Sequence, residues 1–120
     1  MKYVLLIYQG TTPLPSSPAD WATLSQEEQK AVYADYNAIN LTPGVTPGLP
    51  LGLANKATTV RVRDGQTVAT EGPFVDSMRA VAGYLVFEAD SIDDAISLAG
   101  RVPAARHGGA VEVRPAETYW

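Results

Sequence analysis

The sequence contains no cysteine and only one histidine, His107, and these shortages exclude several kinds of site. Without thiols the chain forms no disulfide, no zinc-thiolate centre and no cysteine nucleophile. One histidine among scattered carboxylates also gives no ligand spacing that is typical of a metal site. We therefore expect a fold held together by packing alone, with neither a metal ion nor a cofactor.

Positive charge is scarce as well, with 9 basic against 13 acidic residues and a formal net charge of −4. A surface that binds a phosphate backbone needs clustered basic residues, so general nucleic-acid binding is not expected. The apolar residues 1–8 are too few to span a bilayer, and no small-residue cleavage site follows them. We expect a cytoplasmic protein that binds no membrane, with a small molecule and a second copy of itself as partners.

The first strand and the first helix are predicted within one domain, the usual number for 120 residues. Residues 3–8 form a continuous apolar run, typical of a central strand buried on both faces. The proline-rich residues 11–18 predict a surface loop. Ser25 and Glu28 have the spacing of a capping box, which predicts a helix over residues 26–40.

The second half of the chain predicts a hairpin, two strands and a helix. Alternation over residues 58–63 and 66–70 flanks Asp64-Gly65, a favoured hairpin turn. Residues 81–89 and 110–114 also read as strands, and Ser91 with Asp94 predicts the start of a helix that runs to about Arg101. Residues 41–55, with three prolines and three glycines, are expected to form a long loop that could be the rim of a pocket.

This order of elements predicts an α+β fold, a ferredoxin-like sandwich in which an antiparallel sheet carries two helices on one face. We expect Val60 and Val62 to point toward the helices, with Thr59, Arg61 and Arg63 pointing away. In the last strand, Val111 and Val113 should face the core, opposite Glu112 and Arg114. The uncovered face is then partly apolar and partly charged, which suits a homodimer.

Several stretches carry a resemblance to a known family, and they follow one another over nearly the whole chain: Glu71-Gly72-Pro73-Phe74, Gly83-Tyr84, Glu88-Ala89-Asp90-Ser91 and residues 103–115. The sequence resembles the DGPF-domain branch of the YCII-related family. The resemblance implies a ferredoxin-like fold and a dimeric α+β barrel. It also implies a gene encoded beside sigma factors of the extracytoplasmic-function type and a family mostly without an assigned reaction. The wider superfamily includes dehydrochlorinating lyases, isomerases and cyclases.

The signature departs from this family in two places. Glu71 stands where the family has aspartate, and Met78-Arg79 replaces a usual Lys-Glu pair. The wider family resembles a His-Asp dyad system with its histidine near the first strand, and His107 does not lie there. The dyad is therefore not carried over. The Gly72-Pro73 turn also has a structural explanation, as a rigid corner with Phe74 plugging the core beneath it.

Four residues are candidates for proton transfer: His107, Glu71, Asp76 and Tyr8. His107 suits acid or base chemistry near neutral pH, and the alternative is an exposed turn residue before Gly108-Gly109. Glu71 could transfer a proton or, as turn acids more often do, bind the backbone. Asp76 follows the signature in a loop that could overhang a pocket.

Three residues are candidates for substrate binding: Arg61, Arg79 and Tyr84. Arg61 could hold a carboxylate with two hydrogen bonds, and the alternative for both arginines is solvated charge. The pattern does not decide whether Tyr3 or Tyr8, or whether Tyr84 or Leu85, faces the open side. The leading hypothesis is a cofactor-independent lyase, isomerase or cyclase with its pocket between the open sheet face and residues 41–55. The alternative is a non-catalytic ligand-binding or regulatory homodimer, linked to an extracytoplasmic-function sigma factor.

Overall fold

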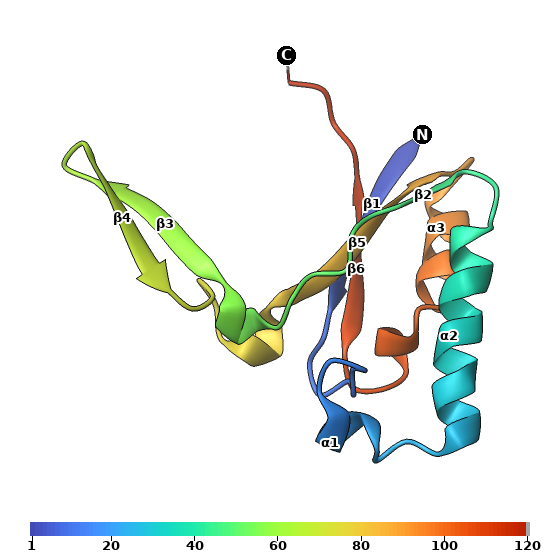
Figure 1. Ribbon diagram of the computed structural model, residues 1–120. Coiled ribbons are helices and arrows are strands. Elements are labelled where there is room, and N and C mark those ends of the chain that lie inside the picture. The colour runs from blue at the N-terminus through green and yellow to red at the C-terminus, as the bar shows by residue number, and fades with distance from the viewer. Residues whose placement is uncertain (120) are drawn as a thin grey trace.

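The computed structural model describes residues 1–119, and its centre is a four-stranded antiparallel sheet (Figure 1). The strand order is β2-β5-β1-β6, in which every neighbouring pair is antiparallel. The strands are β1 (Lys2–Tyr8), β2 (Val45–Pro47), β5 (Val81–Glu88) and β6 (Ala110–Pro115). β1 lies centrally, as predicted. Two strand-helix-strand units in this order make the predicted ferredoxin-like α+β fold.

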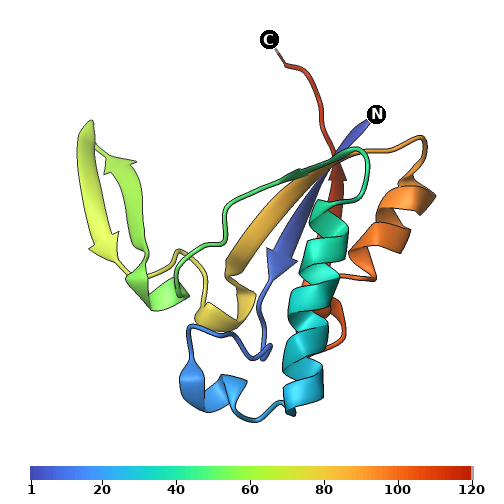
Figure 2. The same ribbon diagram turned by 45° about the vertical axis from the view of Figure 1, so that its right-hand side comes forward.

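Two helices, α2 (Gln26–Asn40) and α3 (Ile92–Ala99), lie on the same face of this sheet (Figures 1 and 2). The opposite face carries no helix. Shorter helical segments connect the main elements and were not predicted from the sequence: α1 (Pro18–Trp21) and the 3-10 turns η1 (Ala54–Lys56), η2 (Ser77–Arg79) and η3 (Pro103–Ala105). The helix layer is therefore one-sided, as the sequence predicts.

The starts of both main helices follow from their capping residues. The Glu28 amide donates to Ser25 Oγ at 3.1 Å, and the Glu28 carboxylate accepts from the Ser25 amide at 3.5 Å. This reciprocal capping box satisfies free amides of the first turn and confirms the helix over residues 26–40. At α3 the Asp94 amide donates to Ser91 Oγ at 3.4 Å. The helix ends at Ala99, two residues before the predicted end.

The hydrophobic core lies between the sheet and the helices. Leu5 is completely buried, and the core contains Tyr3, Leu5, Ile7, Ile39, Leu85, Phe87, Ala95, Leu98 and Val102. Val111 and Val113 pack against it from β6, as predicted. The prediction that the first strand is buried on both faces is wrong. Val4, Leu6 and Tyr8 are only half-buried, because α2 and α3 both lie on the other face of the sheet.

The hairpin of β3 (Thr58–Arg63) and β4 (Gln66–Glu71) forms where predicted but does not belong to the main sheet. Its strands pair only with each other, and the hairpin projects away from the sheet (Figure 1). The expectation that Val60 and Val62 face the helices is therefore wrong, because these side chains are 60% and 69% exposed.

The position expected for the hairpin is occupied by β2, which lies inside the predicted loop of residues 41–55. β2 pairs with β5 from Val45 opposite Phe87 to Pro47 opposite Leu85. Beyond it, the Gly48 amide donates to the Tyr84 carbonyl at 3.1 Å. A proline is tolerated here because β2 is an edge strand. The expectation of an irregular loop over residues 41–55 is thus corrected to a short edge strand followed by η1.

The hairpin turn makes a direct prediction about Gly65. Asp64 and Gly65 have φ of 50° and 76°, so both central residues of the turn are left-handed, as in a type I′ turn. Gly65→Val should destabilise the hairpin by more than about 1 kcal/mol, because a β-branched residue is strained at positive φ. The measurement is amide hydrogen exchange of β3 and β4. Gly65→Asn is the control, since asparagine tolerates this conformation, and equal exchange rates in both variants would contradict the turn type.

Candidate functional site

The open face of the main sheet is one wall of the candidate site. Residues paired directly across strands lie on the same face, and Leu6 pairs with both Tyr84 and Glu112. Tyr84 therefore lies on the open face while Leu85 lies in the core, which settles the register. The apolar side chains of this face are Val4, Leu6, Tyr8, Tyr84 and Val86.

The same face carries an ion pair, as the alternation in β6 predicts. The Arg114 guanidinium donates to the Glu112 carboxylate. This hydrogen bond and the charge of Glu112 raise the pKa of Arg114, and Tyr8 adds a smaller contribution in the same direction. The open face thus combines an apolar centre with the ion pair of Glu112 and Arg114 on β6.

A groove of about 410 Å³ lies at the base of the hairpin, and its lining is mostly apolar. Leu51, Leu53 and Phe74 line it together with Thr59 of β3 and Val81 of β5. Val81 pairs with Tyr8 across a bulge, so the groove adjoins the end of the open face at which Tyr8 lies. The prediction that residues 41–55 form the rim of a pocket has structural support, because Leu51, Leu53 and the neighbouring η1 line this groove.

Arg61 and Phe74 meet on the groove side of the hairpin. The Arg61 guanidinium carbon lies 5.7 Å from the centre of the Phe74 ring, within the range of a cation–π contact. Thr59 and Arg61 are two residues apart on one strand, so both lie on the same face of the hairpin. Arg61 therefore places a positive charge beside an apolar groove.

Phe74 does not plug the core, so that prediction is wrong. Its side chain is 74% exposed, because the turn before it leads the chain away from the helix layer. Two bonds fasten this turn to the hairpin base: the Gly72 amide donates to the Ala57 carbonyl, and the Thr59 hydroxyl donates to the Gly72 carbonyl, each at 2.7 Å. Gly72 has φ of 101°, which favours glycine.

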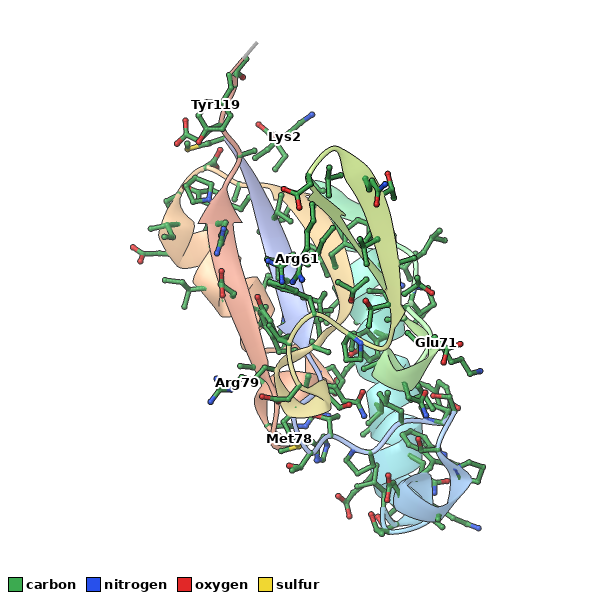
Figure 3. All side chains as sticks on the ribbon, turned by 90° about the vertical axis from the view of Figure 1, so that its left-hand side faces the viewer. Lys2, Arg61, Glu71, Met78, Arg79 and Tyr119 are labelled. Carbon is green, nitrogen blue, oxygen red and sulfur yellow. The ribbon has the colours of Figure 1, made fainter. Side chains whose placement is uncertain are left out.

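Glu71 and Asp76, two predicted catalytic acids, lie on either side of this turn. Asp76 caps η2, because its carboxylate accepts from the Arg79 amide at 3.1 Å and lies 3.6 Å from Arg79 Nε. Glu71 is exposed at the end of β4, opposite Thr58, and has no hydrogen-bond or ion-pair partner among residues 1–119. Figure 3 shows Glu71 and Arg79 pointing to opposite sides. The structure therefore does not bring these residues together.

His107 is half-buried in the turn between η3 and β6. Its backbone amide donates to the Pro103 carbonyl at 3.1 Å, while its imidazole has no hydrogen-bond or ion-pair partner in the described part of the chain. The glycine pair after it has a packing explanation, since a Cβ on Gly109 would lie 2.3 Å from the Tyr8 carbonyl oxygen. These contacts favour the structural interpretation of the turn.

Of the four predicted proton-transfer residues, only Tyr8 lies on the open face, beside the groove. Of the predicted ligand-binding residues, Arg61 lies over Phe74 on the groove side of the hairpin and Tyr84 lies on the open face of the sheet, and neither of them lines the groove itself. Sequence reasoning missed the apolar lining from Leu51, Leu53 and Phe74. The available signal was the run of apolar residues within a loop otherwise rich in proline and glycine.

Tyr36, whose pKa is also shifted, lies apart from this site. Burial raises the pKa of Tyr36 in the helix layer, and nearby Arg106 opposes that effect. Among residues 1–119, no group of three or more histidine, cysteine, aspartate or glutamate side chains is placed to hold a metal ion. No helix in the same range is long and apolar enough to cross a membrane.

Comparison with known proteins identifies the family. The model of the YCII-related domain matches residues 1–117, so the chain belongs to the YCII-related family. An uncharacterized protein of Rhizobium meliloti (strain 1021) is 28% identical over 124 residues, covering 99% of this chain and 94% of that protein. These similarities identify the family and name no reaction.

Asp76 can hold η2 through its capping oxygen or through its negative charge, and two variants separate these contributions. Asp76→Ala removes the cap of η2, so the Arg79 amide should exchange faster with solvent, since a lost cap costs about 1 kcal/mol. Asp76→Asn keeps a capping oxygen and should preserve the protection. Proton exchange followed by NMR measures both variants. Faster exchange of equal size in both would show that the charge, and not the cap, holds the turn.

Proposed function

We propose that the chain is a homodimeric protein that binds a small molecule with an apolar body and an anionic group. The observation that carries this proposal is the apolar groove at the hairpin base with the Arg61 guanidinium above Phe74. Small-molecule sites are typically concave and apolar with a few placed polar groups. The arginine supplies a fork of donors that suits a carboxylate or a similar anion.

The charges around the groove favour an anion although the chain as a whole is acidic. Lys56 of η1 lines the groove together with the apolar residues, and Arg63 follows Arg61 on the same face of β3. The aromatic ring of Phe74 offers a flat apolar surface beneath the arginine. A ligand lying on Leu53 and Phe74 would therefore have its anionic end within reach of Arg61.

The molecular surface supports a homodimer. The accessible surface of the chain is 8153 Å², whereas a compact monomer of its mass exposes about 6,300 Å². The radius of gyration is 16.0 Å, against about 14 Å for a compact chain of this length. The projecting hairpin and the open sheet face both contribute to this additional surface, and both carry exposed apolar side chains, among them Val60, Val62 and Tyr84.

A cofactor-independent enzyme of lyase, isomerase or cyclase type is the second candidate, favoured by Tyr8. This phenol lies on the open face, where it pairs with Val81 of the groove lining and contributes to the raised pKa of Arg114. A proton-transferring Tyr8 would exchange a substrate proton with solvent. We would incubate a panel of 2-oxo and β-keto carboxylates in heavy water and follow deuterium by NMR. Exchange that survives Tyr8→Phe would contradict this role, and no exchange with any compound would leave binding as the function.

The assignment to the DGPF-domain branch is part of the proposal. It rests on the stretches named above, which include Glu71-Gly72-Pro73-Phe74, and Pro73 and Phe74 of this turn line the groove. A cytoplasmic location and a link to an extracytoplasmic-function sigma factor belong to the same proposal, and the neighbouring genes would test the link.

The ligand site predicts how the chain binds a fluorescent apolar anion. Anilinonaphthalene sulfonate should bind the wild-type protein, and Arg61→Met should weaken its binding about tenfold, because a charge-assisted hydrogen bond is lost. Arg63→Met is the matched control on the same strand face and should change the affinity less. The neutral probe phenylnaphthylamine should bind wild type and Arg61→Met equally. Equal loss with Arg61→Met and Arg63→Met would contradict a specific site.

The dimer predicts a solution mass of two chains at micromolar concentration, measured by light scattering. The physical reason is that a monomer would leave the apolar side chains of the open face and the hairpin in water. A monomeric mass across that range would contradict the homodimer.

A further inference from the structure

The hairpin has two different faces, and among residues 1–119 only one of them is in contact with other parts of the chain. Thr59 and Arg61 lie on the groove side, with Arg61 over Phe74. Val60 and Val62 point to the opposite side, where Ala69 and Thr67 lie across from them on β4. We call Val60, Val62 and Ala69 the outer stripe of the hairpin. All three side chains are exposed.

A hairpin in this state needs a partner. An isolated two-stranded hairpin is at best marginally stable in water, because it has no face on which to bury apolar surface. Here the two strands pair only with each other, and every residue of the two strands except the half-buried Thr59 is exposed. Exposed valines on a short two-stranded sheet also form an apolar surface that tends to associate with other protein surfaces.

We infer that the hairpin is an arm that lies on a second copy of this chain, with its outer stripe against the open sheet face of that copy. The inference rests on the homodimer proposed above and adds which surfaces meet. Val4, Leu6 and Val86 form the apolar part of the open face, which has no cover within the chain. The outer stripe is an apolar surface of matching character, displayed on a projecting element.

Symmetry and area favour a second copy over another partner. One chain carries both surfaces, so a two-fold pair buries each of them twice with a single kind of contact. The surplus of roughly 1,900 Å² per chain over a compact monomer is the amount that an obligate homodimer interface buries on each side. Two mutually inserted arms would bury part of this surplus without a further protein.

This arrangement makes the ligand site a property of the dimer. The groove adjoins the open face at Val81 and Tyr8, so an arm lying on that face borders the groove. The arm of the second copy would then exclude water from a ligand held by Leu53 and Phe74. In a single chain the same groove is open to solvent on that side.

The absence of cysteine allows a direct test by cross-linking. Val62→Cys places a thiol on the outer stripe, and Val4→Cys places one on the open face. The two variants are mixed, allowed to exchange subunits, and treated with a short bis-maleimide. We expect a cross-linked product that mass spectrometry identifies as one chain of each variant. Mixing Val62→Cys with Ala34→Cys, on exposed helix surface, is the matched control and should give no such product.

Each outcome bears on a different statement. A protein of dimeric mass that links only Val4→Cys to Val4→Cys, or that links at neither position, overturns the arm and leaves the homodimer standing. A monomeric mass overturns both. Circular dichroism and the melting temperature of each variant establish that it is folded before cross-linking, so that a missing product reports on contact and not on folding.

Discussion

The structure depends on one constraint, which is that two helices on the same side of a sheet leave its other side uncovered. Leu5 and its neighbours in the core are buried because α2 and α3 lie over them. Val4 and Leu6, one residue away on the same strand, have no such cover. The apolar character of that face has a cost only if it remains in water. The homodimer proposed above would remove this cost, and the proposed arm would lie on the same uncovered face.

The short strand β2 determines the position of the hairpin. By pairing with β5 it takes the edge position of the main sheet and directs the following chain outward. Gly48 makes this close approach possible, since a Cβ there would lie 2.2 Å from the Tyr84 carbonyl oxygen. The displaced hairpin and the sheet are then two walls with the Phe74 groove between them. A connection that looks irregular in sequence thus creates the concavity in which a ligand can bind.

Local sequence signals predict local structure, but they do not predict contacts between residues that are distant in the sequence. The capping box at Ser25, the turn at Asp64-Gly65 and the alternation in β6 all act within a few residues, and the elements that they predict are present. The alternation at Val60 and Val62 is the same whether the strand faces a core of its own chain or another surface. The prediction that these valines face the helices is wrong for this reason. The prediction for Phe74 is wrong for a similar reason, because an aromatic residue after a turn can pack in a core or line a groove. The prediction that Arg61 and Tyr84 bind a ligand rests on the chemistry of their side chains alone. Their positions, on the groove side of the hairpin and on the open face of the sheet, follow only from the arrangement of the strands.

The most direct test of the covered face is amide hydrogen exchange of the hairpin as a function of protein concentration. Amides of β1 should be protected at every concentration, because the helix layer of the same chain stabilises that strand. Amides of β3 and β4 should be protected in concentrated protein and should lose that protection on dilution, as the second copy dissociates. Hairpin amides that exchange rapidly in a sample of dimeric mass, or that stay protected in a monomer, would contradict the claim that a second copy covers this surface.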